Sequence, residues 1–111
     1  MTVAALQLGP AAAAPPSAGD DLGQLAAVLG QSHALRQACR GPDDMYWRER
    51  MQRLIEAQDP SDELRQRLTS AFNDGFARAR AGKPGCTPAI RQQAARSAER
   101  GRQLALSLAS P

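Results

Sequence analysis

Apolar residues recur at helical spacing in four stretches of the chain, and short segments rich in glycine and proline separate them. The longest clear stretch covers residues 60–81. Its apolar stripe is Leu64, Leu68, Ala71, Phe72, Phe76 and Ala79. Asp59 reads as the N-cap with Pro60 at the first helical position, and the run 82–85 ends the helix. We expect this helix to be the central element, with the other helices packed around it.

Three further helices are predicted on either side of the central stretch. The first covers residues 21–38, the second covers 44–58, and the third begins at Thr87-Pro88 and runs to about Ala109. Trp47, Met51, Leu54 and Ile55 give the second of these a continuous apolar face. Valine and isoleucine are too scarce to favour a sheet. The pattern therefore predicts an all-α fold, a small antiparallel four-helix bundle.

The two cysteines, Cys39 and Cys86, stand at the end of the first predicted helix and just before the last. An even pair in a small secreted domain indicates one disulfide, which would tie the two outer helices together. Neither cysteine belongs to a C-x-x-C motif, so a thioredoxin-type redox motif is not expected. One histidine and two cysteines also make a poor set for a structural zinc ion, and we expect no cofactor.

The N-terminal residues 1–20 contain no lysine or arginine and are rich in alanine and proline. This composition is typical of the end of a signal peptide, with an A-x-A cleavage site but no charged n-region. A disordered tail is the alternative. We assign residues 21–110 to one helical domain and expect a periplasmic or secreted protein whose signal peptide is truncated in this chain. No stretch approaches the length of a membrane span.

The net charge of +3 is modest, but it is unevenly distributed. Residues 75–111 carry six arginines and Lys83 against Glu99 alone. Arg91, Arg96, Arg100 and Arg102 make the last helix basic. A solvated helix face is the simplest explanation. That helix has no aromatic residue for base stacking, so nucleic acid is a less favoured partner than an acidic envelope polymer or an envelope protein.

A small polar groove for a ligand or peptide is one interpretation of Arg48, Asn73 and Arg80. The simpler interpretation is that Gly75 permits a close helix contact while Asn73 bonds locally or to solvent. His33 lies on an apolar stripe, either as a general base or pH sensor or as a satisfied, partly buried side chain.

Carboxylate pairs and aromatic side chains also have structural explanations. The pairs Asp43-Asp44, Asp62-Glu63 and Glu56 with Asp59 sit at predicted helix starts, where capping accounts for them. A cofactor pocket is conceivable from four side chains, but their spacing is typical of a core. These are Trp47, Met51, Phe72 and Phe76.

The order of these features resembles an uncharacterised family of small exported alphaproteobacterial proteins. The shared pattern is LG-x4-LR-x2-C, then W-R-x2-M-x2-L, F-N-x-G-[FY] and C-T, over residues 22–109. The matching residues are Leu29, Gly30, Leu35, Arg36, Cys39, Trp47, Arg48, Met51, Leu54, Phe72, Asn73, Gly75, Phe76, Cys86 and Thr87. The resemblance implies export and an all-α fold, and it implies no activity.

Three functional hypotheses follow from the sequence. The favoured one is a non-enzymatic, disulfide-linked periplasmic domain that binds another envelope component. The second is an envelope enzyme that uses a carboxylate or His33. The third is a basic helical protein that binds nucleic acid.

Overall fold

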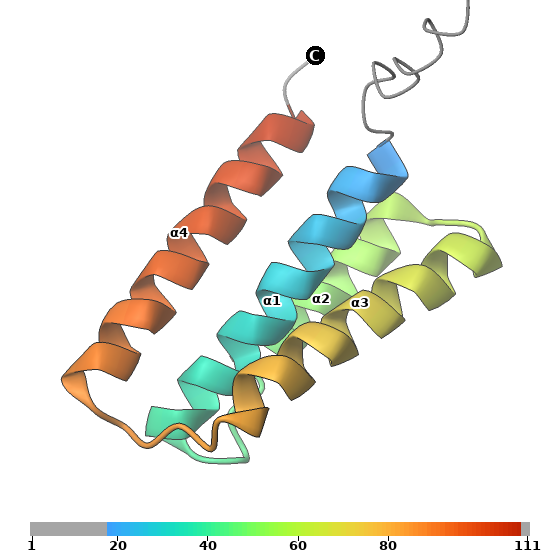
Figure 1. Cartoon of the computed structure of the whole chain (residues 1–111). Coiled ribbons are helices and arrows are strands. Elements are labelled where there is room, and N and C mark those ends of the chain that lie inside the picture. The colour runs from blue at the N-terminus through green and yellow to red at the C-terminus, as the bar shows by residue number, and fades with distance from the viewer. Residues whose placement is uncertain (1–17, 110–111) are drawn as a thin grey trace, which may run out of the picture.

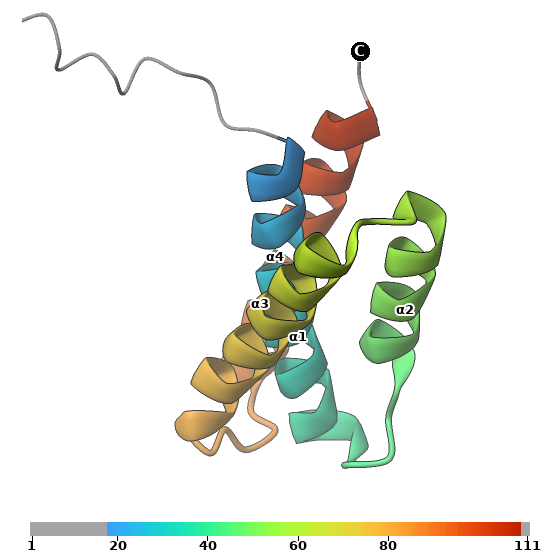
Figure 2. The same ribbon diagram turned by 90° about the vertical axis from the view of Figure 1, so that its right-hand side faces the viewer.

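The structure is a computed structural model that describes residues 18–109. Within them the chain forms four α-helices, α1 (Ala18–Arg40), α2 (Tyr46–Gln58), α3 (Asp62–Ala81) and α4 (Pro88–Ala109), joined by short connections. Consecutive helices alternate in direction, and α3 crosses α1 at an angle (Figures 1 and 2). The predicted all-α bundle is confirmed. The signal-peptide prediction falls mainly on residues 1–17, which lie outside the described residues, whereas residues 18–20 already belong to α1.

The central helix is α1, so the prediction that residues 60–81 form the centre is wrong. Helix α1 packs against α3, α4 and α2, whereas α4 stands apart from α3 on the far side of α1 (Figure 1). The reason lies in how much of each helix is buried. Helix α1 buries residues around most of its circumference: Leu22, Leu25, Ala26, Val28, Leu29, Gly30, Ser32, His33, Ala34 and Leu35. Helix α3 buries only one stripe, Leu68, Phe72 and Gly75.

Two glycines allow α1 and α3 to approach closely. A Cβ atom on Gly30 would lie 2.0 Å from the carbonyl oxygen of Phe72. A Cβ atom on Gly75 would lie 2.1 Å from the carbonyl oxygen of Ala27. The predicted close contact at Gly75 is therefore confirmed, and Gly30 is its counterpart on α1.

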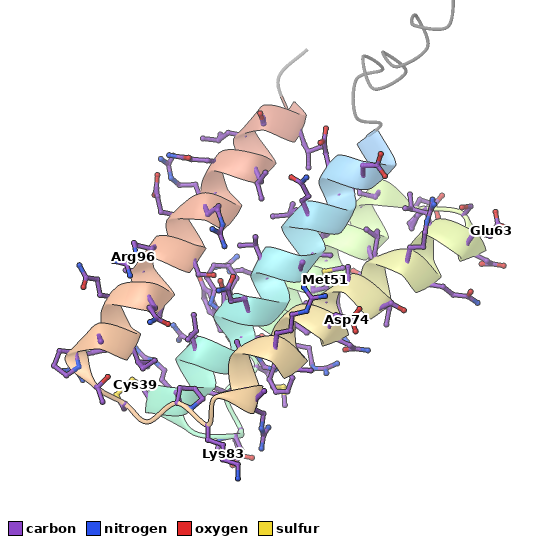
Figure 3. The ribbon with its side chains drawn as sticks, viewed as in Figure 1. Cys39, Met51, Glu63, Asp74, Lys83 and Arg96 are labelled. Carbon is purple, nitrogen blue, oxygen red and sulfur yellow. A yellow bond between two sulfur atoms is a disulfide. The ribbon has the colours of Figure 1, made fainter. Side chains whose placement is uncertain are left out.

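Helix α4 is joined to α1 by small side chains and by the disulfide. The Oγ atoms of Ser32 and Ser97 lie 2.7 Å apart in the buried contact, and Gly101 faces the side chain of Val28. Near the end of α1, Cys39 is bonded to Cys86, as predicted (Figure 3). Leu104 and Leu108 pack against the core nearer the C-terminal end of α4.

Helix α2 attaches through Met51, which is buried, and through the partly buried Trp47, Leu54 and Ile55. This placement confirms the predicted apolar face. The preceding turn is fixed by Arg36, whose Nε donates to both carboxylate oxygens of Asp44 at 3.0 and 2.9 Å. Asp44 therefore pairs with Arg36, and α2 begins two residues later, at Tyr46.

The helix caps differ from the prediction at one of two sites. The N-cap of α3 is Ser61, whose Oγ accepts from the backbone N–H of Leu64. Asp59 instead ends α2 in a left-handed conformation with φ 44°. Thr87 caps α4 as predicted, because its Oγ1 accepts from the backbone N–H of Ile90 and Pro88 is the first helical residue.

Candidate functional site

His33 is buried inside the bundle and does not face a cleft. Its side chain is 2% exposed, and its ring lies 5.7 Å from that of Phe72 and 5.1 Å from that of Phe76. Nδ1 is buried without a hydrogen-bond partner among the described residues, so the expectation of a satisfied histidine is wrong. In this position the imidazole is almost fully shielded from solvent. Burial lowers the pKa of His33, the Arg48 charge lowers it further, and Asp44 opposes them.

The lowered pKa of His33 predicts that the fold loses stability in mild acid. The unfolded chain binds a proton at His33 near pH 6.5, while the folded chain does so only at lower pH. We expect the free energy of unfolding to fall as the pH drops below about 6.5, until the folded-state pKa is passed. Urea titrations between pH 8 and pH 5 measure this. The His33→Leu variant should show a flatter profile, and an unchanged profile would assign the acid sensitivity to other groups.

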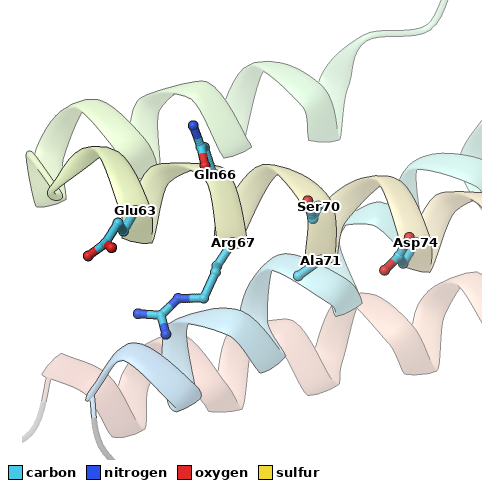
Figure 4. A pocket seen from close by; sticks show the side chains of 6 residues that line it. All are labelled: Glu63, Gln66, Arg67, Ser70, Ala71 and Asp74. Atoms are coloured by element: carbon cyan, nitrogen blue, oxygen red, sulfur yellow. The ribbon is translucent and has the colours of Figure 1, made fainter.

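The polar hollow along α3 brings no pair of catalytic carboxylates together (Figure 4). Its lining residues are Glu63, Gln66, Arg67, Ser70, Ala71 and Asp74. Glu63 and Asp74 stand on the same helix, and a rise of about 1.5 Å per residue places their backbones roughly 16 Å apart. A glycosidase pair lies within about 10 Å. Asp62 and Glu63 occupy the first turn of α3, as the capping explanation predicted.

The predicted polar groove is divided between two cavities. Arg48 and Asn73 line one cavity of about 260 Å³ between α2 and α3, together with Thr69. The Arg48 guanidinium lies 5.6 Å from the centre of the Phe72 ring. Arg80 instead lines another cavity, beside the ends of α1 and α3, together with Lys83.

A third cavity, which we call the arginine groove, lies between α1, α2 and α4 and has a volume of about 390 Å³. Its lining combines apolar residues with three arginines. The residues are Leu35, Arg36, Cys39, Arg40, Trp47, Arg91, Ala94, Ala95 and Ala98. Within the described part of the chain, no carboxylate lines this groove. A cavity lined by apolar residues and several arginines suits an acidic ligand that also carries an apolar part.

The charges of the arginine groove are only partly neutralised by the protein. Arg36 pairs with Asp44 through Nε and lies 4.4 Å from the centre of the Tyr46 ring. The side chain of Arg40 makes no hydrogen bond or ion pair with the described residues. Arg91 contacts a sulfur atom, with Nη1 3.4 Å from Cys86 Sγ. Two of the three positive charges therefore have no anionic partner among residues 18–109.

Sequence reasoning missed the arginine groove, although a signal for it was present. Arg36 and Arg40 are four residues apart on one helix, and Cys39 lies between them. Arg91 follows Cys86 by a little more than one helical turn. Once the disulfide is predicted, it brings these three arginines to the same end of the bundle.

None of the helices within residues 18–109 is both long and apolar enough to cross a membrane. In the same part of the chain, no three His, Cys, Asp or Glu side chains gather where they would hold a metal ion.

Comparison with known proteins gives one match. The model of a family described as protein of unknown function (DUF2385) matches residues 18–111, which covers all the described helices. No curated protein and no solved structure matches the chain.

Proposed function

Because the chain belongs to the DUF2385 family, whose function is unknown, we propose a function from its own surface. The protein is a non-enzymatic binding module of the cell envelope, and it binds an acidic partner through the arginine groove. The observation that carries this proposal is that Arg36, Arg40 and Arg91 line one cavity together with apolar side chains, while no carboxylate of the described residues lines it. The partner is an acidic segment of an envelope protein or an acidic polymer.

Arginine suits this role because its planar guanidinium donates two parallel hydrogen bonds to a carboxylate. The apolar residues that line the groove, Leu35 and the alanines of α4, would pack against the uncharged part of the partner. Trp47 supplies an aromatic wall, of the kind enriched in protein-binding surfaces. Electrostatic attraction would speed the encounter, and the affinity would fall with added salt.

The test uses polyglutamate as the acidic probe and polyglutamine as its uncharged counterpart. Trp47 is the only tryptophan, so its emission reports binding directly at the groove. We expect polyglutamate to change the emission and polyglutamine to leave it unchanged. Replacing Arg40 and Arg91 by alanine together should weaken polyglutamate binding by about tenfold or more at low salt.

The matched control removes the same charge from outside the groove. Arg53 on α2 and Arg96 on α4 are both exposed, and neither lines the groove. The Arg53→Ala, Arg96→Ala double variant should bind polyglutamate nearly as well as the unmodified protein. Equal weakening in both double variants would mean that net charge alone attracts the probe, and the proposal would fail.

The disulfide supports an oxidising location, because such bonds persist mainly outside the cytoplasm. We assign the protein to the periplasm or the extracellular space on this ground. Intact mass of the protein from a periplasmic fraction, with and without reduction, tests the assignment. Two blocked thiols in that fraction support it, and an unprocessed cytoplasmic chain with two free thiols contradicts it.

The cavity between α2 and α3 is the second candidate for a binding site. It joins Arg48 and Asn73 with the apolar side chains of Met51, Ile55 and Phe72. Its size suits a small ligand with one anionic or amide group. An Asn73→Ala variant that loses a small ligand while keeping polyglutamate binding would separate the two sites.

A further inference from the structure

The Cys39–Cys86 disulfide lies in a chemically asymmetric setting on the protein surface. Both cysteines are exposed, and only Cys39 lines the arginine groove. We propose that this disulfide is a site of thiol–disulfide exchange, at which the thiolate of an acidic peptide or protein attacks Cys39 and releases Cys86. The proposal adds a covalent reaction to a domain whose proposed function is binding alone.

The attacked sulfur is Cys39 because the incoming thiolate is an anion. An acidic thiol that enters the arginine groove meets Arg36, Arg40 and Arg91 together with the Cys39 side chain. These charges raise the local concentration of anionic thiols beside Cys39.

The leaving sulfur is Cys86 because its surroundings stabilise a negative charge. Arg91 Nη1 lies 3.4 Å from Cys86 Sγ. Cys86 also comes directly before Thr87, the residue that caps α4, so it stands at the positive end of that helix dipole. Cys39 is one residue from the end of α1, where the dipole disfavours an anion. The better-stabilised thiolate leaves faster, which fixes the direction of opening.

The reaction balances with thiols as the only co-reactant. The incoming thiolate forms a bond to Cys39 Sγ, and the electron pair of the Cys39–Cys86 bond leaves on Cys86 as a thiolate. A second thiol of the partner, as thiolate, then attacks the partner sulfur of this mixed disulfide and releases the Cys39 thiolate. Two partner thiols are thereby oxidised to one disulfide, and the protein disulfide is reduced to two thiols.

The attack on Cys39 and the release of Cys86 rest on the surroundings of the disulfide, whereas the preference for an acidic thiol rests on the proposed function. The test treats the oxidised full-length protein with glutathione, a small acidic thiol, or with uncharged 2-mercaptoethanol. Early samples are quenched with N-ethylmaleimide, digested and analysed by mass spectrometry. We expect both thiols to be found on Cys39 and N-ethylmaleimide on Cys86.

The Arg91→Ala variant tests the leaving-group assignment. It should slow opening by 2-mercaptoethanol roughly fivefold and reduce the excess of Cys39 adducts. Arg91→Lys, which keeps the charge, should restore part of the rate, and Arg96→Ala should react like the unmodified protein. Arg91 and Arg96 are both exposed, and thermal unfolding would verify that the variants are folded.

Two results would overturn the proposal. The first is that glutathione or 2-mercaptoethanol forms adducts equally on both cysteines, or mainly on Cys86. The other is an Arg91→Ala rate equal to that of Arg96→Ala. A failure of polyglutamate binding combined with adducts on Cys39 would reject the proposed acidic partner and leave the exchange site standing.

Discussion

Replacing Gly30 by alanine is expected to destabilise the fold by about 3 kcal/mol, the upper part of the usual range for overpacking. The added Cβ would lie 2.0 Å from the Phe72 carbonyl oxygen and 3.0 Å from the Phe76 nitrogen. Both are backbone atoms, so no side-chain rotation relieves the clash, and α1 and α3 must move apart. Urea denaturation followed by circular dichroism measures the loss. The reciprocal variant, Gly75→Ala, should lose a similar amount.

The control for Gly30→Ala is another glycine of the same helix. A Cβ atom on Gly23 would have no atom of the described residues within 4 Å, so alanine there meets open space among them. Because alanine favours the helix over glycine by about 1 kcal/mol, Gly23→Ala should leave the fold unharmed or stabilise it. If Gly30→Ala proved as stable as Gly23→Ala, the close contact between α1 and α3 would be refuted.

Removing the disulfide is expected to cost about 4 kcal/mol, according to the chain-entropy relation for a loop with a sequence separation of 47 residues. That is a large fraction of the 5–15 kcal/mol, roughly, that stabilises a typical domain. Helix α4 is affected most, because α1 is its main packing partner. The Cys39→Ser, Cys86→Ser double variant, compared with the oxidised protein by urea denaturation, gives the value.

Hydrogen exchange shows where that stability is lost. In the double variant the amides of α4 should lose more protection than those of α3, which packs along α1 through the glycine contact. The reduced and alkylated protein serves as the control and should resemble the double variant. A loss below about 1 kcal/mol, or equal loss of protection in α3 and α4, would mean that noncovalent contacts alone hold α4.

The sequence predicted well those elements that depend on local signals. Thr87-Pro88 identified the start of α4, and the spacing of Trp47 and Met51 identified the buried face of α2. The start of α3 was harder to predict, because Asp59 and Ser61 are both good capping residues. Only the structure shows that the hydrogen bond to Leu64 is accepted by Ser61.

The central position of α1 was not predictable from amphipathicity. A one-sided stripe is easily recognised, whereas a helix that is buried around most of its circumference shows little contrast between its faces. By helix propensity alone, Gly30 weakens this helix. In the fold it allows close packing against the backbone of Phe72, which is distant in the sequence. Composition does not reveal such a contact.

The candidate site was predicted less well than the fold, because its parts come from different helices. Arg48 and Asn73 share a cavity, but helical position alone did not place Arg80 in a different one. The burial of His33 could be predicted from its place on an apolar stripe. The missing hydrogen bond at Nδ1 could not, because the neighbours of the ring, Phe72 and Phe76, belong to another helix.

Formation of the disulfide also determines when the arginine groove is complete. Arg36 and Arg40 come from α1 and Arg91 from α4, and the bond between these two helices is at the edge of the groove. A newly made chain has reduced cysteines, so nothing covalent yet holds Arg91 beside the other two. Oxidation completes the set of three charges, so under the proposed function the protein would acquire its full attraction for acidic partners only in an oxidising compartment.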